Sequence, residues 1–396
     1  MRRSSLFLAC VILLSALNAE SASSFDPNQA AKVFSKLADA PELRNPSVEL
    51  VDVSTGQVIF QSNAFSQRKP ASTLKILSAV ATLKYFDPAS SFATSVSIGT
   101  EENSLVINGD FDPWISMNND VATRMNRTSF YRLAQAGLRA INKNSKKPVK
   151  KFKVYYNGIY SNEAVTLKSY YKKKGFSTRL IEVTEKDARA LSAELVSYST
   201  SPTVKEIMDW YLTWSDNLLA ERMARLAAKQ AGNGFNSTGV RVTFKAILKD
   251  FGIDSRKLVI RDASGLSRYN KVTANILSTL LVKIHSDPTL ASLIDGLPVS
   301  GKSGTLLERY IKSAPTAVGL VKAKTGTLSG TVSLAGFVQS KDREYAFVVI
   351  ADRIERTYSA GEKARKTIDK FLGKIAAPLV IENVGSEPDA IDFQIL

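Results

Sequence analysis

Apolar and polar residues follow two different periods along this chain. Between residues 72 and 85, Leu74, Leu77, Val80 and Leu83 recur at the spacing of one helix face. The same period predicts further helices over residues 28–38, 130–141, 203–214, 217–230, 239–249, 273–285 and 360–375. Short apolar runs bounded by turn residues predict strands over residues 48–53, 57–61, 92–98, 104–107, 152–156, 318–324, 332–339 and 345–351.

The order of these elements predicts the fold class. The first two strands flank Ser54-Thr55-Gly56 and form a hairpin, and the last two are joined by Lys341-Asp342-Arg343. Hairpin-connected strands between an N-terminal and a C-terminal helix indicate an α/β (α+β) fold, with an antiparallel sheet flanked by helices. The pattern changes between residues 88 and 200, which we interpret as a smaller inserted unit within a larger one made of residues 23–87 and 201–380. No structure is predicted for residues 381–396.

The N-terminus has the pattern of a secretion signal. Arg2 and Arg3 precede an apolar run over residues 6–17, and the small residues Ala19, Ser21 and Ala22 follow. A membrane anchor is the alternative, but a spanning helix needs about 20 apolar residues. We therefore expect residues 1–22 to be a cleaved signal peptide, and the mature protein to be exported to the periplasm or cell-wall space.

Composition excludes several classes of active site. The chain has 396 residues, of which 44% are hydrophobic, enough for one large core and a second smaller one. Its single cysteine, Cys10, lies in the signal, so the mature protein has no disulfide, cysteine-zinc site or catalytic thiol. Its single histidine, His285, cannot build a two-histidine zinc site, and we expect it to be a surface or packing residue. No metal or cofactor is predicted.

The formal charge of +16 indicates what kind of partner the protein could bind. An exported protein this basic suits an anionic cell-wall polymer or an acidic membrane surface. A merely solvated basic surface is the alternative. Nucleic acid is not expected, because the protein is exported and lacks the aromatic and basic motifs of nucleic-acid modules.

Without a usable histidine or cysteine, a serine nucleophile needs a lysine as its base. Ser72 and Lys75 are three residues apart on the predicted helix, so the amine can reach the hydroxyl. The helix N-terminus also supplies backbone N–H groups where an oxyanion would form. A Ser-x-x-Lys motif by itself is weak, because it recurs by chance in basic proteins.

Two further motifs strengthen this interpretation. Ser215-Asp216-Asn217 begins a helix, and Lys324-Thr325-Gly326-Thr327 lies at the end of an apolar strand. Each has a plain structural explanation, as a helix cap and as a turn entered through glycine. Together with Ser72-x-x-Lys75, in this order and on these elements, they predict one catalytic site.

Each residue type in these motifs has a chemical task. Lys75 must be neutral to accept a proton, and burial near the positive Lys324 would lower its pKa. Ser215 can relay a proton between Lys75 and the leaving amine, and the Asn217 amide can hold the substrate backbone. The backbone N–H groups of Ser72 and Thr327 are the expected oxyanion pair.

The third motif also predicts a substrate-binding strand edge. Lys324, Thr325 and Thr327 form a cationic, hydroxyl-lined edge suited to a free C-terminal carboxylate. Gly326 lacks the side chain that would block a substrate lying along that edge.

Several stretches carry a resemblance to a known family: residues 70–75, 109–113, 215–221, 262–268, 304–309 and 324–328. Over roughly residues 30–375 the chain resembles the D-alanyl-D-alanine carboxypeptidase/endopeptidase family of penicillin-binding protein 4 type (DacB-like), among the penicillin-recognising serine enzymes. The resemblance implies a β-lactamase/transpeptidase-like catalytic domain interrupted by an insertion. It also implies removal of the terminal D-Ala from peptidoglycan stem peptides and cleavage of their cross-links, without metal or cofactor, and acylation of the serine by β-lactams.

Some features depart from the family or leave alternatives. The segment between Lys75 and Ser215 is shorter than the family leads us to expect, which predicts one compact inserted unit and bears on endopeptidase more than carboxypeptidase activity. Ala263 replaces a usual glycine and requires a negative φ.

Two other functions are possible for these motifs. A secreted serine β-lactamase shares the three motifs and would use a carboxylate such as Glu221 or Asp262 to activate water. A catalytically silent cell-wall-binding module is the third possibility.

Overall fold

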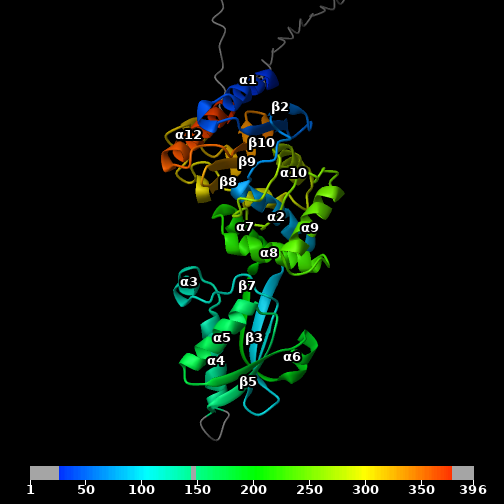
Figure 1. Cartoon of the computed structure of the whole chain (residues 1–396), viewed down its shortest axis with the longest axis vertical. Coiled ribbons are helices and arrows are strands. Elements are labelled where there is room, and N and C mark those ends of the chain that lie inside the picture. Colours follow the sequence, from blue (N-terminus) through cyan, green and yellow to red (C-terminus); the bar gives the residue numbers. More distant parts are fainter. Residues whose placement is uncertain (1–25, 144–148, 377–396) are drawn as a thin grey trace, which may run out of the picture.

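A computed structural model of the chain describes residues 26–143 and 149–376 (Figure 1). The predicted signal peptide and the tail after residue 380 lie outside the described residues. None of the described helices combines the length and the apolar character needed to cross a membrane. Figure 1 shows two bodies stacked along the long axis, each built around its own sheet.

The first sheet joins strands from both ends of the chain in the order β2-β1-β10-β9-β8, all antiparallel. In the central pair, Leu50 lies opposite Phe347. β8 forms one edge of the sheet. Val299 bridges its outer side at Lys322, whereas the stretch from Lys324 to Leu328 has no backbone partner there among the described residues. The predicted antiparallel sheet is therefore confirmed. Its strands are β1 (Ser47–Asp52), β2 (Val58–Ser62), β8 (Val321–Leu328), β9 (Thr331–Ser340) and β10 (Arg343–Ala351).

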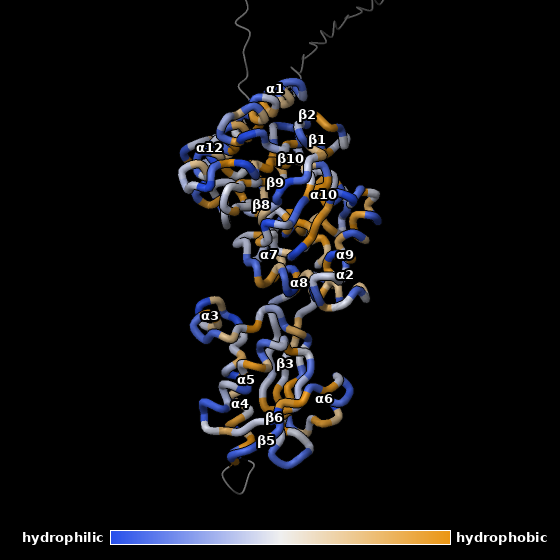
Figure 2. Tube along the Cα trace, viewed as in Figure 1, coloured by the Kyte–Doolittle hydropathy of each residue, from blue (hydrophilic) through white to orange (hydrophobic). Residues whose placement is uncertain are grey.

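Both faces of this sheet are buried, which explains why its strands are almost continuously apolar. Along β10, Val348 faces one core and Phe347 the other, as strand alternation requires. The Phe347 face is covered by α1 (Pro27–Ala38) and α12 (Tyr358–Ala376). On the Val348 face, α10 (Ala274–Ser286) packs against the strands, and α2 (Lys75–Tyr85), α7 (Val204–Thr213), α8 (Asn217–Gln230), α9 (Ser237–Asp250) and the short α11 (Ser292–Asp295) complete the same core. Figure 2 shows the hydrophobic residues along α10 beside these strands.

Residues 91–203 form a second sheet, ordered β6-β5-β4-β3-β7, and we call them the second-sheet unit. β4 and β5 pair in parallel, as do β5 and β6, so this sheet is mixed. Helices α4 and α5 bury one face, whereas α6 covers part of the other. The elements are β3 (Ser91–Gly99), β4 (Ser104–Gly109), α3 (Asn119–Arg124), α4 (Phe130–Lys143), β5 (Lys151–Asn157), α5 (Ser161–Lys173), β6 (Ser177–Glu182), α6 (Glu185–Leu191) and β7 (Ser192–Thr203).

The hydrophobic pattern did not predict residues 161–203, and burial explains why. Most side chains of β6 and β7 are exposed or half-buried, so they lack a continuous apolar run. The predicted strand over residues 318–324 also begins three residues later, at Val321, and continues to Leu328. Lys324 to Thr327 therefore lie within β8 rather than after it.

One buried arginine ties the second-sheet unit to helix α8. Arg222 of α8 donates to Glu163 at 2.9 Å and to the carbonyl oxygens of Pro113 and Ile115 at 3.1 and 3.3 Å. Its guanidinium lies 4.0 Å from the ring centroid of Tyr160. Because Arg222 and Glu163 are both buried, the junction depends on this pair being complete.

Candidate active site

Ser72 lies in a tight turn that leads into a helix. A 3₁₀ turn over Ala71–Leu74 precedes α2, and Ala71 has a positive φ of 50°. The Pro70 carbonyl accepts hydrogen bonds from Thr73 Oγ1 at 2.7 Å and from Ser333 Oγ of β9 at 2.6 Å. The turn is thereby fixed to the first sheet, while Ser72 itself remains partly exposed.

The loop over residues 262–268 packs directly against this turn. Gly265 has φ +85°, and a Cβ on it would lie 1.8 Å from the Ala71 carbonyl oxygen, so no other residue fits there. Ala263 is not among the residues with positive φ, so its methyl group is tolerated, as the sequence required.

Lys75 connects three parts of the site. Its Nζ lies 3.0 Å from Ser72 Oγ, 2.7 Å from Asn217 Oδ1 and 2.8 Å from the Ser264 carbonyl oxygen. An ammonium has three protons, so these acceptors saturate it. The sequence predicted the contact with Ser72 only. Asn217 was expected to hold the substrate and not to contact Lys75, and the Ser264 carbonyl was missed because a backbone oxygen carries no sequence signal.

Burial favours the neutral form of this lysine. Desolvation lowers the pKa of Lys75 to about 8, against the charges of Asp216, Asp262 and Glu221, which raise it. Burial lowers the pKa of Lys324 well below its usual value, and the charge of Lys75 lowers it further. About a tenth of Lys75 is therefore neutral at pH 7, far more than for an ordinary lysine, and this form can accept a proton.

The Ser215-Asp216-Asn217 motif starts α8. Asp216 caps the helix by accepting from the Leu219 N–H at 3.0 Å, and Ser215 has a positive φ of 63°. Asn217 is exposed, and its Nδ2 has no hydrogen bond among the described residues. The Ser215 hydroxyl likewise makes no hydrogen bond to Lys75 in the described part of the chain.

Arg127 reaches this motif from the second-sheet unit. Its Nη2 lies 3.2 Å from Asp216 Oδ2, and its guanidinium stacks 4.4 Å from the Trp114 ring centroid. Sequence reasoning missed Arg127, because nothing along the chain relates it to a helix cap 89 residues away.

The third motif occupies the free edge of the first sheet. Lys324 is fully buried, and its Nζ donates to the Thr325 carbonyl at 3.1 Å. A Cβ on Gly326 would lie 2.2 Å from Ser333 Oγ and 2.9 Å from the Pro70 carbonyl oxygen, so glycine is needed for β8 to approach the Ser72 turn. Thr325 Oγ1 donates to Thr305 Oγ1 at 2.7 Å.

The two carboxylates expected of a β-lactamase water site are engaged elsewhere. Glu221 Oε1 accepts the N–H groups of Ala263 and Ser264 at 2.6 and 3.0 Å. Asp262 accepts the N–H groups of Gly265 and Ser267 at 2.6 and 2.5 Å. Both carboxylates thus hold the loop that presents the Ser264 carbonyl to Lys75.

The single histidine of the chain lies away from this site. His285 lies on α10 with Nε2 3.0 Å from Glu344 Oε2 of β10. Across residues 26–143 and 149–376, no group of three or more histidine, cysteine, aspartate and glutamate side chains could hold a metal ion.

Comparisons with known proteins match this arrangement. The D-Ala-D-Ala carboxypeptidase 3 (S13) family model matches residues 29–146 and 159–375. The D-alanyl-D-alanine carboxypeptidase of Actinomadura sp. (strain R39) is 37% identical over 164 residues, 40% of this chain and 30% of that protein. Carboxypeptidase DacB of Mycolicibacterium smegmatis (strain ATCC 700084 / mc(2)155) is 36% identical over 160 residues, 39% of this chain and 34% of that protein.

The matched stretches thus span about a third of the length of these curated relatives. The fold is shared more widely. The crystal structure of penicillin binding protein 4 (dacB) from Haemophilus influenzae has a TM-score of 0.66 at 18% identity, covering 86% of this chain and 97% of that one. Since the family model covers most of the described residues, the chain belongs to the D-Ala-D-Ala carboxypeptidase 3 (S13) family.

Proposed function

We propose that this protein is a serine-type D-Ala-D-Ala carboxypeptidase that acts on peptidoglycan stem peptides through an acyl-enzyme on Ser72. The observation that carries the proposal is the contact between Ser72 and a buried lysine. Lys75 Nζ lies 3.0 Å from the hydroxyl and has a pKa lowered to about 8, beside the stretch of β8 from Lys324 to Leu328, whose outer side has no backbone partner among the described residues. A nucleophile, its base and a peptide-binding edge are the parts that acyl transfer needs.

The substrate would bind as an added strand on β8. An extended peptide can form main-chain hydrogen bonds with the free edge, while the exposed Asn217 amide donates to a substrate carbonyl. The terminal carboxylate would lie by the hydroxyls of Thr325 and Thr327, near Lys324. An anion there favours the charged form of Lys324, and so raises its pKa when substrate binds.

Acylation then follows from the Lys75 contact. Neutral Lys75 takes the Ser72 proton as Oγ attacks the carbonyl carbon of the penultimate D-Ala, and the N–H groups of Ser72 and Thr327 stabilise the oxyanion. The C–N bond breaks, and the proton passes from Lys75 through Ser215 to the leaving D-Ala nitrogen. Water attacks the ester, giving the shortened peptide and restoring the Ser72 hydroxyl. A β-lactam would acylate Ser72 in the same way, but its amine stays tethered.

We also propose a domain division and a cellular location for the protein. Residues 88–200 would be an inserted domain within a catalytic domain made of residues 23–87 and 201–380. Export to the periplasm or cell-wall space would bring the site to its polymer, and the net charge of +16 would favour an anionic wall polymer or membrane surface.

Intact-mass analysis with benzylpenicillin tests the proposal. We expect the wild type to gain the mass of one benzylpenicillin and to keep it for hours. Ser72→Ala should gain none, whereas Ser161→Ala, an exposed serine of α5, should behave as the wild type. Rapid loss of the adduct would instead indicate a β-lactamase. A folded wild type that forms no adduct would indicate a binding module.

A further inference from the structure

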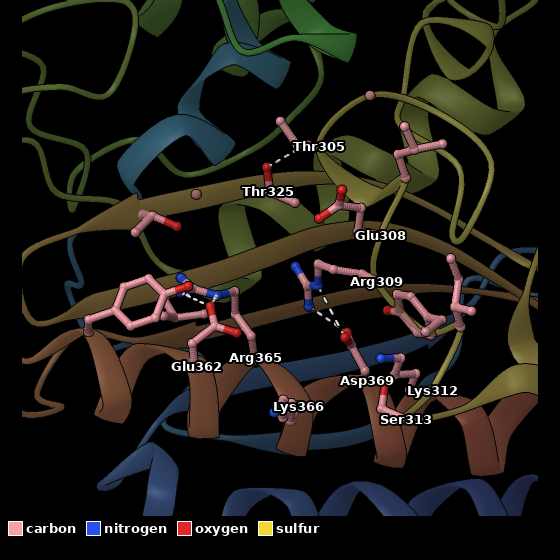
Figure 3. Close-up of a pocket in the computed structure, with 18 residues that line it drawn as sticks. Thr305, Glu308, Arg309, Lys312, Ser313, Thr325, Glu362, Arg365, Lys366 and Asp369 are labelled. Atoms are coloured by element: carbon pink, nitrogen blue, oxygen red, sulfur yellow. Dashed lines mark hydrogen bonds and ion pairs between the residues drawn. The ribbon is translucent and has the colours of Figure 1, made fainter.

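Residues 304–309 carry part of the family resemblance, but no step of the proposed reaction uses them. They line a groove beside the outer edge of β8, together with residues 325–327 and one side of α12 (Figure 3). Figure 3 shows a dashed line between Thr305 and Thr325 at one end of this groove, and Arg309 beside Asp369 further along it. The segment therefore lies against the strand that carries the third motif.

Two contacts fix the segment on either side of Thr305. Gly304 has φ +54°, and a Cβ on it would lie 2.4 Å from the Thr213 carbonyl oxygen at the C-terminal end of α7. Arg309 Nε lies 3.1 Å from Asp369 Oδ2 of α12, and both of these side chains are largely buried. Thr305 itself remains exposed. Its hydroxyl is thus held in place from both sides, as a ligand-binding group must be.

The Thr305 hydroxyl makes one hydrogen bond and can make another. Thr325 Oγ1 donates to Thr305 Oγ1 at 2.7 Å, and no acceptor for the Thr305 proton occurs among the described residues. A hydroxyl has one proton to donate, and these two hydroxyls use only one of their two protons on each other. The pair can therefore donate to an acceptor that comes from outside the protein.

A carboxylate is the acceptor that suits this pair. The proposed function places the terminal carboxylate of the substrate by Thr325 and Thr327, near the buried Lys324. An ionised carboxylate has two oxygens with about four acceptor positions, so it can accept a proton from both Thr305 and Thr325. One neutral hydrogen bond between the hydroxyls is then exchanged for two charge-assisted ones, which are about twice as strong. An uncharged ester or amide in the same place offers no such gain.

We propose that Thr305 is a third hydroxyl of the carboxylate seat, and that it determines the preference for a free carboxylate on the leaving residue. The inference rests on the proposed acyl transfer at Ser72. Thr305 would contact the leaving residue only, so its loss should leave the contact between Lys75 and Ser72 intact. Arg309, held by Asp369, would position the segment without touching the substrate.

Benzylpenicillin and its methyl ester test the inference, because they differ only in the carboxylate that represents the terminal carboxylate of the substrate. The second-order rate constant of acylation is measured with both compounds, and the ratio of acid to ester is compared between variants. For Thr305→Val we expect this ratio to fall about tenfold, since one charge-assisted hydrogen bond is lost. Thr305→Ser keeps the hydroxyl and should keep most of the ratio. Thr100→Val, at an exposed position after β3, is the control and should match the wild type.

The outcomes separate this inference from the proposed function. If Thr305→Val slows acylation by the acid and the ester equally, Thr305 acts through the fold or the nucleophile, and its role in the carboxylate seat is overturned. An unchanged ratio, in a variant whose fluorescence shows it to be folded, would also overturn that role. In both cases the proposed function stands, because the wild type is still acylated. A folded wild type that neither compound acylates would overturn the proposed function itself, and the carboxylate seat with it.

Discussion

The two sheets of this protein are covered to different extents, and the candidate catalytic residues gather on the better covered one. Helices bury both faces of the first sheet, and almost every residue of β9 and β10 is buried. In the second sheet, β7 leaves Leu195 and Tyr198 more than 60% exposed. A sheet packed on both faces holds its side chains in single rotamers, which a catalytic constellation requires. The second-sheet unit has no such constraint over its outer strands.

The second-sheet unit also contacts the helix that carries part of the candidate site. Arg127 pairs with Asp216, the cap that precedes Asn217, and Glu163 receives Arg222 of the same helix α8. The unit therefore contributes one contact to the position of the Ser215-Asp216-Asn217 motif and one to the junction itself. Substitutions that remove these contacts test how far the two units depend on one another.

The largest expected effect is at the junction. Arg222→Met leaves Glu163 buried without its cation, so the free energy of unfolding should fall by about 3–5 kcal/mol. The measurement is chemical unfolding followed by tryptophan fluorescence. Arg222→Met combined with Glu163→Gln should recover much of the loss, since no uncompensated charge remains. Arg189→Met, in the exposed pair with Glu185, is the control and should change little. If Arg222→Met were as stable as this control, the two units would not be coupled through α8.

The next largest effect is the pH dependence of acylation, which tests Lys75 beside the first sheet. Burial lowers the pKa of Lys75 to about 8, and the base must be neutral, so the second-order rate constant for benzylpenicillin should rise with pH and level off above about pH 8. Well below that pH it should fall about tenfold per pH unit, and between pH 8 and pH 6 it should fall about 50-fold.

The same shift affects stability in a defined direction. The folded pKa of Lys75 lies below its unfolded value, so the unfolded state binds more protons between about pH 8 and the usual lysine pKa of 10.5. The contribution of Lys75 to the free energy of unfolding therefore rises with pH across this window.

The acylation measurement can contradict the role of Lys75. If the second-order rate constant for benzylpenicillin is flat from pH 6 to 9, in protein whose fluorescence shows it to be folded, Lys75 is not the base.

The smallest effect concerns Arg127. Arg127→Ala removes one charge-assisted contact from Asp216, and we expect acylation by benzylpenicillin to slow about tenfold, equivalent to about 1.4 kcal/mol. Arg127→Lys should recover part of the rate, because it keeps a cation. Arg124→Ala removes an exposed arginine of the neighbouring helix α3 and should leave the rate unchanged. Equal rates for Arg127→Ala and Arg124→Ala would mean that the second-sheet unit plays no part in positioning the motif.

Sequence reasoning succeeded where local pattern and local geometry coincide. The helices and strands of the first sheet could be predicted because burial on one or both faces makes their residues periodic or continuously apolar. The contact of Ser72 with Lys75 follows from three-residue spacing on one turn, and the family resemblance followed from short motifs. Residues 161–203 were missed because their elements are mostly exposed and leave a weak hydrophobic pattern.

The sequence by itself determined the element types around the first sheet, the three motifs and the family. Tertiary structure decided which groups surround those motifs. The Ser264 carbonyl on Lys75, Arg127 on Asp216 and Thr305 on Thr325 join positions 189, 89 and 20 residues apart. A groove lined by residues 304–313, β8 and α12 likewise exists only once these three segments pack together. Such contacts depend on how distant segments pack, and no local period in the chain records that packing.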